Sequence, residues 1–313
     1  MSARKPLIIA HRGACGERPE HTMSAYELAI AQGADAIEPD LVMSRDGVLI
    51  CRHENDISGT TNVADHPEFA DRHVEKTVDG VTKVGWWTED FALAELKMLR
   101  CRERMPSVRP GSAAYNDQEP IVTWQELLAL AQAHGVRLVP EFKHVAYFKS
   151  IGLDPVPPFE AVAQAHGGQS AADIMSVECF EVGVLHELAQ SRGLRWRLVQ
   201  LLFSQGGPPD NRDARYSDMI SVDGLRAIAT YASAISVEKG MLIPRDASSR
   251  SLTPTDLAQR AHALGLGVFV WTFRPENFFL PAELRRGADM NAHGDALAEI
   301  KQFAALGVDD AID

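Results

Sequence analysis

The stretch "IIAHRGACGERPEHT" spans residues 8–22 and joins an apolar run to a set of charged residues. Its first residues are apolar and β-branched, which is typical of a buried strand. The run stops abruptly at His11-Arg12-Gly13, and a second charged cluster at residues 18–21 follows closely. Such an ending is typical either of an ordinary surface loop or of the edge of an active site, and the remaining chain is needed to choose between them.

Further apolar runs alternate with helical patterns along the chain, which indicates βα units and a parallel sheet. The predicted strands cover residues 6–10, 36–43, 137–142, 174–178, 198–203, 234–237 and 267–272, and a last strand lies at the end of the sequence. A turn at 45–47 leads into a further extended run at 48–52. Eight strand positions are found without forcing the pattern. We therefore predict the α/β class and a TIM (β/α)8 barrel.

Helix signals lie between these strands. A Ser-x-x-Glu pattern begins at residue 24, a Thr-x-x-Glu pattern at residue 123 and a Thr-Pro pair at residue 253, and each is followed by a glycine, at 33, 135 and 265. The first two patterns resemble capping boxes, and glycine is the usual residue just past a helix end. We expect one helix in each interval.

Between residues 54 and 119 the regular pattern breaks down. This segment is polar and irregular, with Trp86, Trp87 and Phe91 as its main apolar anchors, and we expect one short helix at about 88–100. A barrel needs roughly 250 residues, so a chain of 313 residues leaves room for an insertion. We predict a barrel domain of residues 1–53 and 120–313, with a small subdomain of residues 54–119 inserted after the second βα region.

The composition excludes several classes of protein. The formal net charge is −12 and no basic stripe is present, so we expect no nucleic-acid partner. No apolar run approaches the roughly 20 residues of a membrane span. The four cysteines have no CxxC spacing, which argues against zinc and favours free thiols. The N-terminus runs straight into a strand without room for a signal peptide, so we expect a cytoplasmic protein, or a periplasmic one if this is a mature exported form.

Polar residues lie where the predicted strands end, which in α/β barrels is the rim that carries the active site. They are His11, Arg12, Glu38, Asp40, His53, Glu141 and Lys143. Each of them alone has an ordinary structural explanation, as a loop residue or a salt-bridged strand end. Acids inside strands are costly unless they bind something, so their combination favours a site.

The residue types in this set suit one kind of chemistry. Three carboxylates, Glu38, Asp40 and Glu141, suit one hard divalent cation, Mg²⁺ or Ca²⁺. Two histidines close to that cation are suited to general acid and base catalysis, and an arginine and a lysine supply positive charge for a phosphate. Together these groups indicate metal-assisted cleavage of a phosphodiester.

This constellation resembles the glycerophosphodiester phosphodiesterase family. The resemblance rests on "HRGACGERPEHT", "GADAIEPDLVMSRDGVLICRHEND", "VPEFK" and "VFVWTFRPEN", in that order along the chain. The segments "TTNVADHPEFADR" and "GWWTEDFALAELKMLR" are similar to the bacterial glycerophosphoryl diester phosphodiesterase branch. The resemblance implies a TIM barrel with a small inserted domain. It also implies hydrolysis of glycerophosphodiesters, such as glycerophosphocholine and glycerophosphoethanolamine, to glycerol 3-phosphate and an alcohol.

The resemblance also implies a role for individual residues. His11 and His53 match the acid/base pair, and Glu38, Asp40 and Glu141 match the metal ligands. Phosphate or substrate contacts are implied for Arg12, Lys143, Gln200, Lys239 and Trp271. Two positions depart from the family pattern, because His21 replaces a common Asn and Glu54 follows His53 where Asp is common. The sequence also stops before the usual Asp-Pro-Asp segment of the family.

Two alternatives to this function remain open at this stage. One is a phosphodiesterase acting on lysophospholipids, like lysophospholipase D, for which residues 278–280 offer an apolar entrance. The other is a catalytically idle barrel that binds glycerophosphodiesters. The expected partner is a small-molecule substrate in each case, and the sequence does not indicate an oligomeric state.

Overall fold

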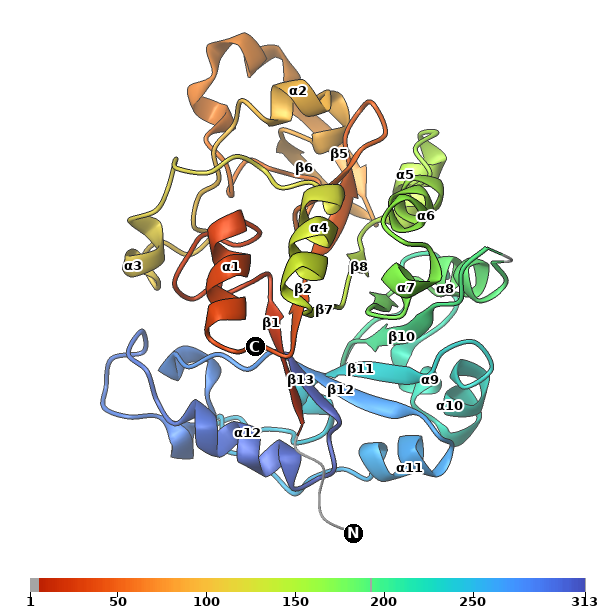
Figure 1. Cartoon of the computed structure of the whole chain (residues 1–313). Coiled ribbons are helices and arrows are strands. Elements are labelled where there is room, and N and C mark those ends of the chain that lie inside the picture. Colours follow the sequence, from red (N-terminus) through yellow and green to blue (C-terminus); the bar gives the residue numbers. More distant parts are fainter. Residues whose placement is uncertain (1–5, 192, 313) are drawn as a thin grey trace. The chain divides into compact units, whose positions relative to one another are not determined.

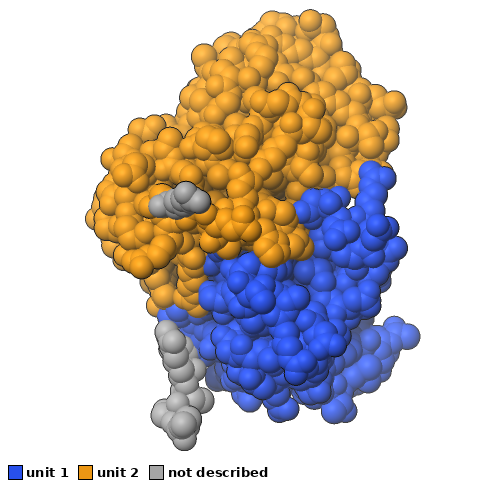
Figure 2. Space-filling model, turned by 90° about the vertical axis from the view of Figure 1, so that its right-hand side faces the viewer, with its two compact units in different colours: residues 1–9, 198–313 blue, residues 10–197 orange. Residues whose placement is uncertain are grey.

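The structure is a computed structural model that describes residues 6–191 and 193–312. The chain divides into two compact units, which Figure 2 shows in different colours. Unit 1 comprises Met1–Ile9 and Leu198–Asp313, and unit 2 comprises Ala10–Arg197. The boundaries predicted between the barrel domain and the inserted subdomain, at residues 53/54 and 119/120, differ from the boundaries of these units. The division into a barrel and an insertion stays a prediction.

Unit 1 is built on a parallel sheet in which the strands follow the order β10-β11-β12-β13-β1 (Figure 1). These strands are β1 (Leu7–His11, whose last two residues fall in unit 2), β10 (Arg197–Leu202), β11 (Ala234–Glu238), β12 (Gly267–Trp271) and β13 (Asp310–Ile312). Their apolar residues, such as Val199, Ile235 and Val268, are fully buried. Such continuous apolar runs are typical of parallel strands covered on both faces.

The helices of unit 1 lie in the connections between these strands. They are α9 (Tyr216–Met219), α10 (Val222–Ile228), α11 (Leu257–Ala263) and α12 (Ala296–Ala304), with the 3₁₀ turns η4 (Lys239–Met241), η5 (Asn277–Phe279) and η6 (Ala282–Leu284). The helix expected from Thr253-Pro254 begins later than predicted, after Asp256, because Thr255 is drawn into a backbone hydrogen bond with Leu242.

Besides a hairpin in segment 54–119, described below, unit 2 contains two groups of paired strands. The strands of these groups are β2 (Ala36–Glu38), β3 (Asp40–Met43), β4 (Leu49–Cys51), β7 (Arg137–Leu138), β8 (Glu141–Phe142) and β9 (Ser176–Cys179). Strand β2 pairs with β7, while β3, β8 and β9 form a parallel set with β4 antiparallel to β3. The predicted strands 36–43 and 137–142 are each divided in two, around Pro39 and Pro140, because proline has no N–H to donate to a neighbouring strand.

Two of the helices that the structure describes in unit 2 lie where the capping patterns predicted them. The helices of this unit are α1 (Met23–Ala31), α2 (Leu93–Leu96), α3 (Pro110–Ala113), α4 (Trp124–His134), α5 (Val145–Ser150), α6 (Val156–Ala165), α7 (Gln169–Ala172) and α8 (Val182–Ala189), with the 3₁₀ turns η1 (Val63–Asp65), η2 (Pro67–Arg72) and η3 (Thr88–Asp90). Helix α4 has the predicted capping box of Thr123 and Glu126. Helix α1 is instead capped by Thr22, because Ser24 hydrogen bonds to Glu119.

The segment 54–119 holds a hairpin that the sequence analysis missed. Strands β5 (Val74–Val78) and β6 (Val81–Gly85) pair antiparallel across the turn Asp79-Gly80, where both residues have positive φ. Asp-Gly between β-branched residues is a strong hairpin signal, so the pattern was there to be found. The single helix expected at 88–100 is replaced by η3 and the short α2.

Two predictions drawn from the composition can be compared with this structure. All four cysteines are free thiols, as predicted. Among the residues that the structure describes, no helix has the length and apolar character needed to cross a membrane.

Candidate active site

The strand ends of unit 2 place most of the predicted site residues. His11 is the last residue of β1 and Glu38 the last of β2, while Asp40 and Glu141 begin β3 and β8. Asp40 is in register with Glu141, and Glu141 is in register with Glu178 of β9. Three acids therefore lie in one row across three neighbouring strands.

The turn after β1 explains why His-Arg-Gly follows the strand. Arg12 and Gly13 both have left-handed backbones, with φ of 61° and 80°. A Cβ atom on Gly13 would lie 2.7 Å from the carbonyl carbon of Ala25. Glycine is therefore required both for its backbone conformation and for the close approach of α1.

Arg12 is held from several sides in this turn. Its backbone N–H donates to Glu38 Oε2 at 2.9 Å. Its guanidinium contacts Glu20 at 3.1 Å and Asp40 at 3.2 Å. Burial opposes the charge, but these two carboxylates outweigh it and raise the pKa of Arg12. The arginine thus stays charged and fixed at the strand end.

Three buried acids converge beside Arg12. Oxygen atoms of Glu38, Glu141 and Glu178 all lie within 4.8 Å of one another. Burial raises the pKa of Glu141 to about 8, and burial together with the neighbouring acids raises that of Glu38 well above its ordinary value. Carboxylates this close repel one another unless a proton or a cation joins them. This cluster can hold a metal ion.

Glu178 was not among the predicted ligands. It lies in the predicted strand 174–178, and an acid at the end of a buried strand was the signal that could have found it. The predicted ligand Asp40 is engaged differently from Glu38 and Glu141. Its Oδ2 is hydrogen-bonded to His21 Nε2 at 2.9 Å. It also forms ion pairs, with Arg12 Nε at 3.2 Å and with Lys143 Nζ at 2.9 Å.

The cations around Asp40 keep it ionised. Burial opposes the charge, but Lys143 and Arg12 lower the pKa of Asp40 well below its usual range. Lys143 also contacts Glu141 at 2.5 Å. Asp40 therefore holds the two predicted phosphate-binding side chains, Arg12 and Lys143, close to one carboxylate.

His53 follows β4 and is half-buried. Its Nδ1 lies 2.6 Å from Glu54 Oε1. Burial, Lys143 and Arg12 lower the pKa of His53 to about 4, so the ring is neutral at pH 7. A carboxylate beside Nδ1 fixes the proton on that nitrogen and leaves Nε2 as the basic atom.

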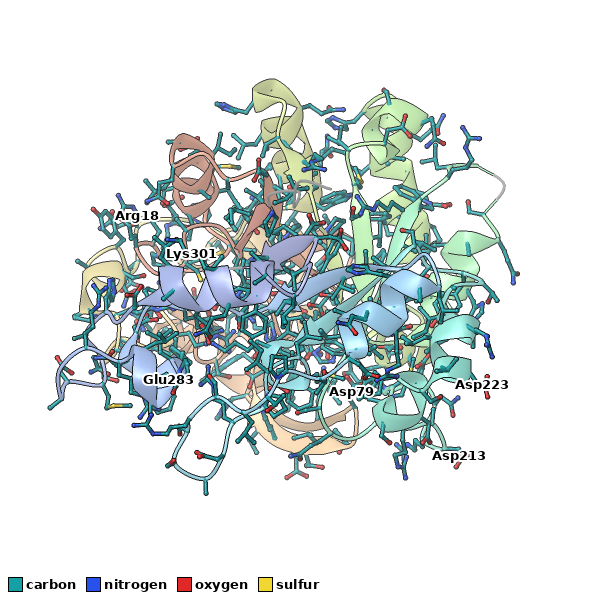
Figure 3. All side chains as sticks on the ribbon, turned by 90° about the horizontal axis from the view of Figure 1, so that it is seen from below. Arg18, Asp79, Asp213, Asp223, Glu283 and Lys301 are labelled. Carbon is teal, nitrogen blue, oxygen red and sulfur yellow. The ribbon has the colours of Figure 1, made fainter. Side chains whose placement is uncertain are left out.

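The turn after β1 is also held by the segment that precedes α4. Arg18, labelled in Figure 3, lies with its Cζ 3.7 Å from the centroid of the Tyr115 ring. Arg109 donates to the carbonyl of Cys15, and Arg104 donates to Glu20. Segment 100–115 therefore holds the turn through three arginine contacts.

The other predicted contacts lie in unit 1. Gln200 is fully buried in β10, and its side-chain oxygen accepts from Tyr231 at 2.7 Å. Trp271 ends β12 and stacks on Phe203, with the ring centroids 5.7 Å apart. Lys239 follows β11 and pairs with the buried Glu299 of α12 at 3.1 Å. The roles predicted for these residues stay predictions.

Comparison with known proteins decides the family. A model of the glycerophosphoryl diester phosphodiesterase family matches residues 11–312. The chain belongs to this family. It is 32% identical over 304 residues to glycerophosphodiester phosphodiesterase GDPD6 of Arabidopsis thaliana, covering 91% of this chain and 79% of the relative. It is 26% identical to glycerophosphodiester phosphodiesterase of Haemophilus influenzae, with 97% and 89% of the two chains covered.

Solved structures of similar proteins show the same fold. A phosphodiesterase of this type from Silicibacter pomeroyi superposes with a TM-score of 0.68 at 19% identity, over 98% of this chain and 89% of that one. An Oleispira antarctica phosphodiesterase in complex with its product sn-glycerol-3-phosphate gives 0.63 at 17% identity, over 98% and 92%. The predictions of an α/β barrel and of an enzyme of this family are confirmed.

Proposed function

We propose that the chain hydrolyses glycerophosphodiesters, such as glycerophosphocholine and glycerophosphoethanolamine, to glycerol 3-phosphate and an alcohol, with the help of one divalent cation. The observation that carries this proposal is the pairing of a buried acid cluster, Glu38, Glu141 and Glu178, with two cations that share Asp40. One group suits a metal and the other suits a phosphate. The product named for the Oleispira antarctica relative is in keeping with this reaction.

The acid cluster fits a hard divalent cation. Glu38 Oε1 is buried and has no hydrogen-bond partner among the described residues, although Oε2 of the same group is held by Arg12. A buried carboxylate oxygen left in this way needs a proton or a cation. Mg²⁺ and Ca²⁺ both prefer such oxygen ligands. Glu38 and Glu141 would hold the ion, with Glu178 or Asp40 completing the set.

The bound cation would supply Lewis-acid polarisation of a phosphoryl oxygen. Arg12 and Lys143 would hold the remaining phosphate charge, because both are kept ionised and fixed by Asp40. A guanidinium is suited to two parallel hydrogen bonds with a phosphate, whereas an ammonium acts as a point charge. The substrate phosphate would therefore be bound in one orientation.

The two histidines would move the protons. Neutral His53, with Nδ1 held by Glu54, offers Nε2 as a base for the attacking hydroxyl, whether this belongs to water or to the glycerol. His11, at the end of β1, would then protonate the leaving alcohol. Such a pair is effective only if, when the reaction starts, the base is neutral and the acid is protonated.

The substrate class can be argued from the residues expected at the entrance. A lysophospholipid needs an apolar surface for its acyl chain, and the sequence offered residues 278–280. In unit 1 Phe278 is 62% exposed, but Leu280 is fully buried and cannot line an entrance. The apolar entrance predicted for an acyl chain is therefore reduced to Phe278 and the partly exposed Phe279. The substrate panel decides between short and acylated substrates. Trp271, at the end of β12, keeps the role predicted from the sequence, a flat apolar wall for the glycerol carbons.

Product identification on a substrate panel tests the proposal. The purified chain, stripped with a chelator and then supplied with Mg²⁺ or Ca²⁺, should release glycerol 3-phosphate from glycerophosphocholine and glycerophosphoethanolamine. The two kcat/KM values should differ by about tenfold or less, roughly 1.4 kcal/mol. Faster turnover of lysophosphatidylcholine, or full activity in the chelator, would overturn the corresponding part of the proposal.

A further inference from the structure

We propose that Arg104, in the segment between β4 and α4, is a positioning residue that holds the catalytic His53 through Glu54. This inference rests on the proposed function, because it assumes that His53 is part of the acid/base pair. It adds a residue from the predicted insertion to the machinery of the reaction.

The guanidinium of Arg104 uses its donors on two carboxylates at once. Nη1 and Nη2 donate to Glu54 Oε1 and Oε2 at 2.8 and 2.6 Å. Nε and Nη2 donate to Glu20 Oε2 and Oε1 at 2.9 and 2.7 Å. Two forked ion pairs on one planar group leave the side chain a single orientation.

The Glu20 pair anchors Arg104 on a rigid part of the unit. Glu20 is almost completely buried and also contacts Arg12 at 3.1 Å and Arg52 at 3.6 Å. It keeps two cations even without Arg104. Loss of Arg104 therefore leaves Glu20 and Arg12 in place.

The Glu54 pair depends on Arg104 much more. Glu54 is half-buried, and among the described residues Arg104 is the cation that pairs with it, while the neutral ring of His53 lies on its other side. With Arg104 present, Glu54 is held in one rotamer and its charge is balanced. Its Oε1 then fixes the ring of His53 through Nδ1 at 2.6 Å. Removal of Arg104 leaves Glu54 free to turn and its charge unbalanced.

Two variants should shift the pKa of His53 in opposite directions. Arg104→Gln removes the cation that balances Glu54, so the carboxylate stabilises the imidazolium more strongly. Glu54→Gln removes the carboxylate itself and stabilises the imidazolium less. The other charged groups around His53 are Lys143, Arg12 and Asp40, and neither variant changes them. If Arg104 and Glu54 only stabilised the fold, the two variants would not shift the pKa of His53 in opposite directions.

Arg102 provides a matched control. It lies two residues away, is exposed to a similar extent as Arg104, and also bridges two carboxylates, those of Asp65 and Asp117. Among the described residues, neither of these acids forms an ion pair with a predicted site residue. Arg102→Gln therefore removes two salt bridges from the same segment without touching His53.

The experiment measures kcat, KM and the pH profile with glycerophosphocholine at saturating cation for the whole chain. Arg104→Gln should lower kcat by about 10-fold to 100-fold, as loss of a group that orients a functional histidine does, with a smaller change in KM. The acidic limb of the kcat profile should move to higher pH in Arg104→Gln and to lower pH in Glu54→Gln. Arg102→Gln should match the wild type.

The double variant Arg104→Gln/Glu54→Gln should lose no more kcat than the worse single variant, because both act through one path. Arg104→Lys keeps the charge but not the fork, so it should lose several-fold in kcat without moving the limb. If Arg104→Gln does not fold, the kcat of Arg104→Lys tests the positioning role by itself.

Unchanged kcat in Arg104→Lys and Arg104→Gln, or a limb that moves the same way in Arg104→Gln and Glu54→Gln, would overturn the inference. Failure of the proposed function looks different. In that case the wild type does not turn over the substrate, or His53→Ala keeps its full kcat.

Discussion

The backbone N–H of Arg12 donates to Glu38 Oε2 at 2.9 Å, and Oε1 of the same carboxylate has no hydrogen-bond partner among the described residues. The residue expected to bind phosphate thus orients a residue expected to bind metal. The free oxygen of Glu38 shares its surroundings with Glu141 and Glu178. One hydrogen bond therefore links the two halves of the candidate site.

Removing the charge of Glu38 should weaken cation binding. Glu38→Gln keeps the size of the side chain but loses the attraction to a cation, so the affinity for Mg²⁺ or Ca²⁺ should fall at least about tenfold, or 1.4 kcal/mol. Titration calorimetry on the stripped protein measures this. Glu178→Gln should act in the same way if Glu178 is a ligand. A wild-type affinity in Glu178→Gln would leave Asp40 as the third ligand.

Cation binding should strengthen as the pH rises. The pKa of Glu141 is raised to about 8 and that of Glu38 is raised as well, so protons compete with the cation near pH 7. Affinity should increase between about pH 6 and 8, with protons released on binding. Calorimetry in buffers of different ionisation enthalpy detects this release. A pH-independent affinity would contradict the raised pKa values.

The stability of the metal-free protein should also depend on pH. Because the folded pKa of Glu141 lies above its unfolded value of 4.5, the folded state binds this proton more tightly. Its contribution to stability is complete below about pH 4.5 and is lost as the pH rises through about 8. Chemical denaturation of the stripped protein at pH 6 and pH 9 should show the loss, and saturating cation should remove this dependence.

The histidines should be needed for turnover and not for folding. His11→Ala and His53→Ala should each lower kcat on the order of 10²-fold or more, with a small change in KM. Steady-state kinetics and thermal unfolding measure the two effects separately. His166→Ala, at the end of α6 and bonded to Gln132, is the control and should keep full turnover. A histidine variant with wild-type kcat would identify that residue as structural.

Gly13 should tolerate no side chain. Gly13→Ala places a Cβ 2.7 Å from the backbone of Ala25 and requires a left-handed backbone, so it should cost about 2–4 kcal/mol of unfolding free energy. Gly16→Ala in the same turn meets nothing within 4 Å and should be nearly neutral. Denaturant unfolding compares the two. Equal stability would mean that the turn relaxes around the new methyl group.

Much of the fold could be predicted from short-range patterns. The runs of apolar residues gave the positions of β1 and β9 to β12 to within two residues, because a buried parallel strand is apolar throughout its length. The end of α4 was also predictable, since Gly135 adopts the left-handed backbone that ends a helix. The β5–β6 hairpin was missed, although the pair Asp79-Gly80 is a sequence signal for a hairpin turn.

What the sequence by itself determined about the site is which polar residues stand at the strand ends, because the position of a residue in a strand is a local property. Only the tertiary structure decided which of these residues meet. Strand register placed Glu178 in a row with Asp40 and Glu141, and the fold of segment 100–115 brought Arg104 to Glu20 and Glu54. Those partners lie 84 and 50 residues away along the chain, and no pattern of neighbouring residues encodes a contact across such a distance, because it depends on how the strands and loops pack.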